Sequence, residues 1–525
     1  MNRNFLFPII LSSGFLTLQI IFGAVSTYEE LLWGKSWLTS VHLGLSLIAL
    51  AAITTIAVLA FRHGQYPADR DKVEGKSFPK NPGSQSKFAK LAFAALLSIF
   101  ILLVSGSIVS NAYPAAACSD WPLCGGSVET WNLNIWINIG HRLIVLISGV
   151  LISLLNIEAW RKYKTNTTIL TSATAAAVLF FAQSLLGAKM VEGFPFHLIL
   201  IHQLAAVSVW ITLVILNVTI GLGAQEDPFE IRNNLTFNFL LGRSKDFIKL
   251  TKPIVVILLL VTTFAGMVIA SGKLPPVNLT IWTLLGGFLA AGGSSAINQY
   301  IDRYDDQKMQ RTQKRPIPSG RITPAEGLAF GASAAIISIF IMTAHVNYLA
   351  GLLTLAGIIY YVLIYSIFLK KATVQNIVIG GGAGAIPPLI GWAAVTGSLN
   401  IPSLFLFAII FVWTPPHFWA LALVRKKDYA RAGVPMLPVV RGEKETRWQI
   451  LIYTIELVIL TMLLPLFGLG GSIYLIGAAL LGLWLISAAW RLWKNEGNKV
   501  AWKMYRYSSM YLAFLFFVLM VDRLL

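Results

Sequence analysis

"NQYIDRYDDQKMQRTQKRPIPSG", residues 298–320, follows an apolar run and crowds acids, amides and bases into one short stretch. Asn298, Asp302 and Asp306 recur at positions i, i+4 and i+8, so on a helix their side chains share one face. Carboxylates gathered at a membrane surface repel one another unless a cation lies between them, and Mg²⁺ binds carboxylates together with substrate phosphates. The stretch therefore predicts a helix that leaves a membrane and binds a metal diphosphate.

Basic residues complete this pattern, and a second charged loop repeats it further along the chain. Lys314 and Arg315 follow the acids and would contact phosphate oxygens directly. The second loop, "WTPPHFWALALVRKKDYARAGVPMLPVVRGEKET", places Asp428 after Arg425 and Lys426. Two such clusters on one side of a membrane would bind a metal diphosphate between them. The alternative is that both are basic membrane-flanking loops whose acids cap helices.

The composition of the whole chain is that of a membrane protein. Of 525 residues, 56% are hydrophobic and 12% are charged, and the mean hydropathy is +0.71; about a quarter of the residues are charged in a soluble domain. We predict an all-α polytopic membrane protein with about fifteen transmembrane helices, about six in a first block and about nine in a second. The net charge of +18 lies in short loops, so it indicates topology and not a nucleic-acid partner.

The two blocks define the expected domains. We expect a first membrane domain over 1–230, a linker over 231–245 and a second membrane domain over 246–525. Loops rich in Lys and Arg alternate with loops poor in them, which predicts a cell-membrane protein with a cytoplasmic N-terminus and an outer C-terminus. The acidic stretch is then cytoplasmic. Cys118 and Cys124 share an outer loop, where they either form a disulfide or remain free thiols.

Three histidines of the first block lie at similar depth in apolar segments. His42, His141 and His202 are each about one or two turns from the outer end of a predicted span. An ionisable side chain inside a membrane is costly unless it has a function, and imidazoles from two helices can bind one heme iron axially. The pattern predicts a heme site, with core packing as the alternative.

The second block resembles the protoheme IX farnesyltransferases (heme O synthases), a branch of the UbiA-type prenyltransferases. The resemblance rests on the two charged loops and on "LTKPIVVILLLVTTFAGM" and "LKKATVQNIVIGGGAGAIPPLIGWAAVTG", and it covers nearly all of 246–525. It implies a UbiA-type helical bundle. It also implies transfer of a farnesyl group from farnesyl diphosphate to a vinyl group of heme b, giving heme O and diphosphate.

The same resemblance implies roles for residues of both charged loops. The aspartates would act in catalysis, with Mg²⁺ bound by Asn298, Asp302, Asp306 and Asp428. The leaving diphosphate would be held by Asn298, Lys314, Arg315, Arg425 and Lys426. His417, in "TPPHFWAL", would contact the heme substrate, and the alternative is a histidine that only packs in the core.

The first block resembles the heme A synthase family. The resemblance is carried by "GSIVSNAYPAAACSDWPLCGG", "NIGHRLIVLISGVL" and "FFAQSLLGAKMVEGFPFHLILIHQLAAVSVW". It implies that His141 and His202 bind a heme b cofactor and that His42 is an additional heme ligand. It also implies that Cys118 and Cys124 are the outer-loop cysteine pair.

The first block departs from that family in two ways. Its first half lacks an opening helix pair, and Asn138 stands where the family has a glutamate three residues before a histidine. We therefore expect a module that holds heme but has lost the oxygenase step, with a separate heme A synthase or a terminal oxidase assembly factor as a partner. The alternatives are a bifunctional heme O and heme A synthase, and a membrane heme-binding or electron-transfer protein without enzyme activity.

Overall fold

The computed structural model describes residues 12–21, 23–25, 38–65, 85–111, 118, 120–122, 124, 132–190, 196–224, 226–227 and 237–525. The regular elements in these residues are helices, and 13 of them are long and apolar enough to cross a membrane. Five of these candidate spans lie in the first block and eight in the second. The chain is an all-helical multi-pass membrane protein.

The 13 candidate spans are fewer than the sequence predicted, for two reasons. The span predicted at 5–27 lies partly outside the described residues, and its described part belongs to a short apolar helix, Ser12–Val25. The span predicted at 449–468 corresponds to α19, Gly442–Met462, which is too charged to be counted among the 13. Its charged side chains are Glu443, Lys444, Glu445, Arg447 and Glu456.

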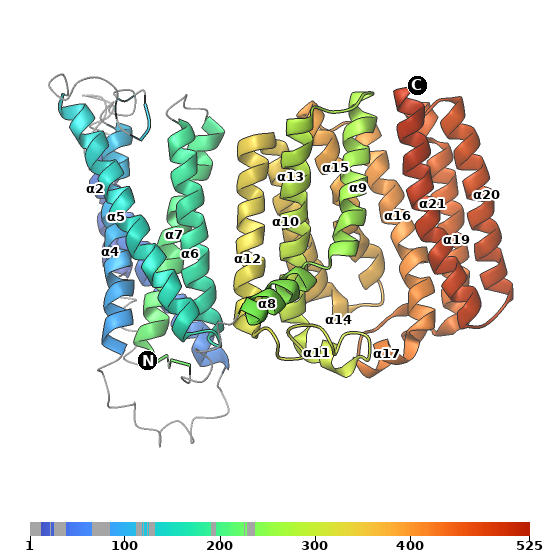
Figure 1. Ribbon diagram of the computed structural model, residues 1–525, viewed down its shortest axis with the longest axis horizontal. Coiled ribbons are helices and arrows are strands. Elements are labelled where there is room, and N and C mark those ends of the chain that lie inside the picture. The colour runs from blue at the N-terminus through green and yellow to red at the C-terminus, as the bar shows by residue number, and fades with distance from the viewer. Residues whose placement is uncertain are drawn as a thin grey trace, which may run out of the picture. The chain divides into compact units, whose positions relative to one another are not determined.

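The chain divides into two compact units, of which the first is Met1–Asn234. Its labelled helices (Figure 1) are α2 (Leu38–Gln65), α4 (Gln85–Asn111), α5 (Leu133–Lys162), α6 (Thr167–Met190) and α7 (Phe196–Gly221). Ala173, Ala176 and Ala177 of α6 are buried, as expected where helix backbones approach closely in a membrane. Trp210 of α7 donates from Nε1 to the carbonyl oxygen of Leu47 at 2.9 Å, which joins α7 to α2.

The second unit is Leu235–Leu525. Its helices are α8 (Phe237–Leu250), α9 (Pro253–Ser271), α10 (Val277–Ile301), α11 (Arg303–Lys308), α12 (Pro324–Ile341), η4 (Met342–Val346), α13 (Tyr348–Ile359), η5 (Tyr360–Leu369), α14 (Lys370–Ala372), α15 (Asn376–Thr396), α16 (Ile401–Val424), α17 (Lys426–Arg431), α18 (Leu437–Val440), α19, η6 (Leu464–Phe467), α20 (Ser472–Lys494) and α21 (Asn498–Leu524). Figure 1 shows α8, α11, α14 and α17 at the same end of this unit. Helix α8 occupies part of the segment 231–245 that the sequence suggested was only a linker.

Local sequence signals determine where these helices begin, end and meet. Thr323 and Glu326 form a capping box at the start of α12. Gly397, with a φ of 67°, ends α15 in the left-handed conformation that glycine adopts without strain. A Cβ at Gly391 of α15 would overlap the carbonyl oxygen of Thr263 in α9, so these two helix backbones are in direct contact.

Candidate functional site

Asn298, Asp302 and Asp306, here called the acid motif, lie where α10 passes into α11. Backbone hydrogen bonds from Asp302 N to Asn298 O at 2.9 Å and from Asp306 N to Asp302 O at 2.8 Å continue the helical register across the junction. The three side chains therefore share one face, and Asn298 Nδ2 donates to Asp302 Oδ2 at 2.9 Å. All three residues are buried although they stand at the end of the bundle.

Basic side chains pair with each acid of this region. Lys370 contacts Asp302, and Arg315 Nη1 lies 2.7 Å from Asp306 Oδ2. Lys371 lies 2.6 Å from Asp305, which is next to the acid motif. The carboxylates are thus held by cations, as buried charges must be.

Lys252 adds a further cation to the acid motif. It precedes the motif in the sequence, whereas Arg315 and Lys370 follow it. Lys252 directly precedes Pro253 and α9, and its Nζ donates to Asn298 Oδ1 at 3.3 Å. Its φ of 51° is the one positive φ at a non-glycine residue in the described part of the chain. Burial, together with the charge of Arg315, lowers the pKa of Lys252 to about 7, although Asp306 and Asp302 act to raise it. Strained backbone and a shifted pKa at one lysine are typical of a functional site.

A π-helix, η5, carries polar side chains to the same place. Asn298 Nδ2 donates to Ser366 Oγ at 3.1 Å, and Ser366 Oγ donates to the carbonyl oxygen of Tyr361 at 2.8 Å. Lys370 follows η5 directly and contacts Asp302. π-helical turns are rare and are frequent at functional sites, and η5 brings Ser366 and the adjacent Lys370 to the acid motif.

The second charged loop meets the first through Tyr429 and Arg311. The two side chains are hydrogen-bonded; burial raises the pKa of the Tyr429 hydroxyl, while the charge of Arg311 lowers it. Asp428 is held instead by Arg431, one turn further along α17, at 3.8 Å. No three acidic, histidine or cysteine side chains converge into a metal cluster in the described residues. The four-residue metal set expected from the sequence stays a prediction, and in this structure Asp428 pairs with Arg431 of its own helix.

The other basic residues predicted to bind diphosphate have different partners or exposed side chains. Lys426 Nζ lies 3.1 Å from Glu443 Oε1. The side chains of Lys314 and Arg425 are exposed, and the carbonyl oxygen of Lys314 accepts a hydrogen bond from Arg321 Nη2 at 3.0 Å. Of the basic residues predicted from the sequence, Arg315 is the one that contacts the acid motif.

His417 is buried inside the bundle and away from the acids. Its ring is stacked against those of Trp413 and Tyr505, with centroids 4.2 and 4.5 Å away, and its Nδ1 lies 2.9 Å from Ser508 Oγ. Ring stacking covers the imidazole, so these contacts are those of a core histidine. Its expected contact with heme stays a prediction.

Helix α8 fastens the loop that carries Arg315. Arg321 Nε lies 3.0 Å from Oδ2 of the buried Asp246 in α8, and the same arginine bonds the carbonyl oxygen of Lys314. Arg243 of α8 contacts Glu326 at the start of α12. The end of α8 leads directly into Lys252, so this one helix positions basic side chains on two sides of the acid motif.

The three histidines predicted to bind heme in the first unit each pack against a glycine. A Cβ on Gly106 or Gly187 would lie 3.3 Å from the Cε1 atom of His141 or His202, respectively. His141 Nδ1 lies 2.9 Å from Ser105 Oγ, and His202 Nδ1 lies 3.1 Å from the carbonyl oxygen of Gln183. With Nδ1 engaged in both rings, Nε2 is the nitrogen available to a metal.

His42 shows the same packing with one difference. A Cβ on Gly23 would lie 2.9 Å from its Cε1 atom. Its Nδ1 is buried and has no hydrogen-bond partner among the described residues. The three predicted histidines thus occur in equivalent helix-pair contacts, and among the described residues His42 Nδ1 lacks the hydrogen bond that the other two possess.

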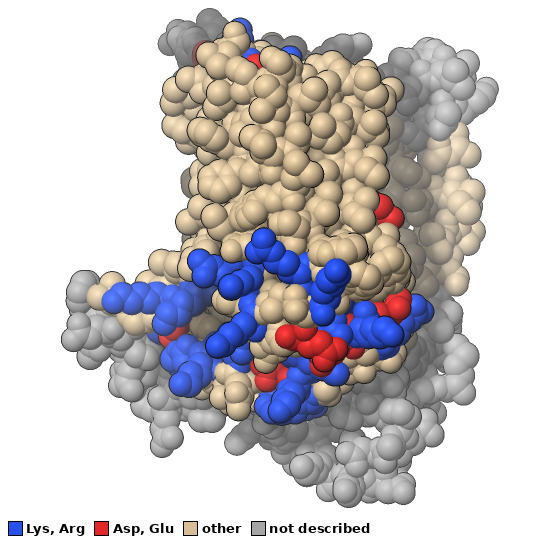
Figure 2. Space-filling model, turned by 90° about the vertical axis from the view of Figure 1, so that its right-hand side faces the viewer, with Lys and Arg blue, Asp and Glu red and all other residues tan. Residues whose placement is uncertain are grey.

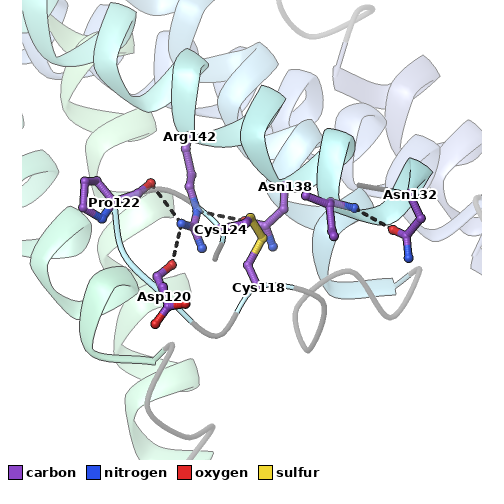
Figure 3. The surroundings of a disulfide bond; sticks show 8 residues. Cys118, Asp120, Pro122, Cys124, Asn132, Asn138 and Arg142 are labelled. Carbon is purple, nitrogen blue, oxygen red and sulfur yellow. Dashed lines mark hydrogen bonds between the residues drawn. A yellow bond between two sulfur atoms is a disulfide. The ribbon is translucent and has the colours of Figure 1, made fainter. Parts of the chain in front are cut away.

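A disulfide joins Cys118 and Cys124 near the start of α5 (Figure 3). Arg142 Nη1 donates to the carbonyl oxygens of Asp120 and Pro122 at 2.8 and 3.0 Å, and its Nε donates to Asn138 Oδ1 at 3.0 Å. Arg142 is adjacent to His141, so the disulfide loop is bonded to the turn of α5 that carries a candidate heme ligand.

Known proteins resemble both units. A protein from Roseiflexus castenholzii, named protoheme IX farnesyltransferase, is 42% identical over 459 residues, which cover 84% of this chain and 85% of that protein. This chain belongs to the protoheme IX farnesyltransferase family. The alignment is longer than the second unit, so this family member also has a counterpart to much of the first. The protoheme IX farnesyltransferase of Symbiobacterium thermophilum is 48% identical over 280 residues, which are 53% of this chain and 94% of that protein.

Family models divide the chain in the same way as its contacts. The UbiA prenyltransferase family matches residues 259–517, and a cytochrome oxidase assembly protein family matches residues 2–215. Among solved structures, a digeranylgeranylglyceryl phosphate synthase aligns with a TM-score of 0.47 at 20% identity, over 54% of this chain and 99% of its own. A UbiA homolog from Archaeoglobus fulgidus, bound to GPP and Mg²⁺, aligns with a TM-score of 0.40 at 16% identity, over 52% of this chain and 99% of its own.

Sequence reasoning missed two basic residues at the acid motif of this farnesyltransferase family member. Lys252 stands in "LTKP" and Lys370 in "FLKK", both at the ends of apolar runs. Each stretch was part of the family resemblance. Each lysine also lies beside a helix end on the same side of the membrane as the acids, and this position could have indicated a role at the acid motif. Neither spacing nor charge alone showed that these lysines turn inward.

Proposed function

We infer that the second unit transfers the farnesyl group of farnesyl diphosphate to a vinyl group of heme b, giving heme O and diphosphate. Family membership supports this activity. The single structural observation that carries it is the buried acid motif surrounded by Lys252, Arg315 and Lys370. Paired acids and inward-facing bases at the end of a membrane bundle are the components that a diphosphate leaving group requires.

The oxygen donors of the acid motif suit Mg²⁺. Asn298, Asp302 and Asp306 offer hard oxygen ligands from one helix face, and all three are buried. Mg²⁺ bound there would act as a Lewis acid toward the diphosphate oxygens. Lys370 and Arg315, which now neutralise Asp302 and Asp306, would then be free to contact the diphosphate itself.

In the proposed reaction, the bond between the allylic carbon of the farnesyl group and the diphosphate oxygen breaks, and its electron pair stays on the diphosphate. Arg315, Lys370 and Lys252 stabilise that charge as it develops. A vinyl group of heme b then bonds to the allylic cation, and water adds to the resulting porphyrin-side cation with loss of a proton. The tyrosines of η5, Tyr361 and Tyr365, are placed near the acid motif, where their rings can shield the allylic cation.

We propose that the first unit holds heme b through His141 and His202. Their Nδ1 atoms are anchored by hydrogen bonds, and the two side chains are close enough for their charges to interact. Asn138, bonded to Arg142, provides no acid at the position where the heme A synthase family has its glutamate. The unit would therefore supply or store heme without oxidising it. A bifunctional heme O and heme A synthase is the alternative, and heme A in cells that contain this chain as their sole candidate heme A synthase would establish it.

We further propose that the acid motif faces the cytoplasm. The basic loops at the α11 and α17 end support this orientation through the positive-inside rule. It places the Cys118–Cys124 disulfide on the oxidising side of the membrane. Labelling of single cysteines placed at exposed loop positions, in sealed vesicles, tests the orientation.

The acceptor can be tested directly. Purified chain is incubated with farnesyl diphosphate, Mg²⁺ and either heme b or an aromatic quinone precursor. The proposal predicts farnesylated heme and no farnesylated quinone precursor. Farnesylation of the quinone precursor alone would overturn the choice of heme while retaining the prenyl-transfer chemistry.

A further inference from the structure

A groove lies between α19 and α20, at the end of the second unit that carries the basic loops. Its volume is about 540 Å³, and it is lined by Arg441, Lys444, Glu445, Trp448 and Trp493. Figure 2 shows the face to which α20 belongs, with Lys and Arg side chains, and some acids among them, gathered in a band at its lower part and a mostly uncharged surface above. The groove therefore combines aromatic walls with positive charge at the edge of an apolar face.

The cations of the groove are not neutralised by their neighbours. Glu443 pairs with Lys426 and Arg447, and Glu496 pairs with Arg447. Arg441 and Lys444 have no ion-pair partner among the described residues, and both are exposed. Positive charge at the groove is therefore available to a ligand.

Glu445 is the one acid among the lining residues. It accepts a hydrogen bond from Gln449 Nε2 at 2.9 Å, one turn further along α19. The lining carries two cations and one anion, so its formal net charge is +1. A ligand with a single negative charge matches it.

Exposed apolar side chains lie further along the two helices that line the groove, as an amphiphilic ligand requires. Trp493 lies 5.9 Å from Trp448 and 4.9 Å from Trp490, measured between ring centroids. Beyond Trp448, the exposed side chains Ile455 and Ile459 follow along α19. On α20, exposed leucines and an isoleucine follow at helical spacing, namely Leu483, Leu480 and Ile476. A soluble phosphate would use the cations alone, whereas a lipid would use the cations and this apolar track.

We propose that this groove is a binding site for an anionic phospholipid with one negative charge, of the phosphatidylglycerol type. Arg441 and Lys444 bind its phosphate, and Trp448 and Trp493 flank the glycerol region. The acyl chains lie along the exposed apolar residues of α19 and α20. Basic pockets between transmembrane helices recognise anionic head groups in this manner, and tryptophan side chains suit the level of the head groups.

The site is tested by native mass spectrometry of the full chain released from membranes in mild detergent, with phosphatidylglycerol or phosphatidylcholine titrated in. The wild type should retain one phosphatidylglycerol more tightly than phosphatidylcholine. The double substitution R441Q/K444Q should weaken phosphatidylglycerol binding about tenfold or more. The matched control K499Q/K503Q removes two exposed cations of the same end that do not line the groove, and its binding should stay within about twofold of the wild type.

A third variant separates lost binding from lost folding. Glu445→Gln removes the repulsive carboxylate, so it should tighten phosphatidylglycerol binding, a gain that misfolding cannot produce. Equal loss in both double variants would mean that charge acts only over the whole surface, and this would overturn the site. Equal binding of phosphatidylcholine would do the same, as would full displacement of the lipid by millimolar inorganic phosphate.

Discussion

Lys252 offers the sharpest quantitative test of the diphosphate site. Its Nζ donates to Asn298 Oδ1 at 3.3 Å, and burial lowers its pKa to about 7. In the empty site this lysine is therefore charged below about pH 7 and neutral above it. A diphosphate binds the charged form better, so kcat/KM for farnesyl diphosphate should fall as the pH rises through about 7. If only the charged form binds, the fall approaches about tenfold per pH unit.

The size of the effect follows from the interaction that is removed. Lys252→Gln deletes a cation beside the leaving group, and a hydrogen bond to a charged group contributes about 1.5 to 3 kcal/mol. We expect kcat/KM to drop about tenfold to 100-fold at pH 6 and to lose its descending limb near pH 7. Lys252→Arg keeps a charge that does not titrate, so its activity should persist at pH 8.

The assay is heme O formation by purified protein between pH 6 and pH 9, with Lys245→Gln as a control. Lys245 is exposed on α8 and should leave the profile unchanged. A descending limb that survives at the same pH in Lys252→Gln would show that another group, and not Lys252, is responsible. The same pKa shift predicts that the empty protein gains stability as the pH rises from about 7 toward the ordinary lysine value, because the unfolded chain then binds more protons.

Three further outcomes follow from the contacts. Asp246→Asn releases Arg321 and the loop that Arg321 holds, so KM for farnesyl diphosphate should rise about tenfold, with a smaller change in kcat. The control Lys249→Gln removes the exposed partner of Asp246 and should change both kinetic constants little. Replacing His202 with alanine should abolish the heme absorption spectrum of the purified chain while farnesyl transfer persists; a wild-type spectrum would exclude it as a ligand. Cys118→Ser should lower the stability of the first unit by about 2 kcal/mol, read from thermal unfolding against the wild type, and reducing conditions should remove that difference.

The acid motif was predictable because it depends on spacing alone. Three residues at i, i+4 and i+8 share a helix face wherever the helix continues, and the backbone bonds through Asp302 show that it does. The all-helical membrane architecture was predictable for a similar reason, since a bilayer requires long apolar helices. Arg315 followed from the nearness of its loop in sequence.

Other parts of the site depend on backbone geometry that side-chain patterns do not encode. Lys252 reaches Asn298 from a left-handed backbone conformation, and Lys370 reaches Asp302 at the end of a π-helix. The role of Asp428 as a fourth metal ligand stays a prediction, and Arg431 on the same short helix is its ion-pair partner. Competition between such nearby partners is decided by rotamers and helix phase, which spacing does not determine.

We propose above that the acid motif drives farnesyl transfer to heme b. Asp302→Asn keeps the size of the side chain and removes the charge that pairs with Lys370. Heme O formation with Mg²⁺ should fall about a thousandfold, because a metal bound to the leaving group stabilises the transition state by several kcal/mol. The control Glu158→Gln neutralises an acid at another helix end and should retain wild-type activity. Undiminished, Mg²⁺-dependent heme O formation by Asp302→Asn would show that the acids have only a structural role.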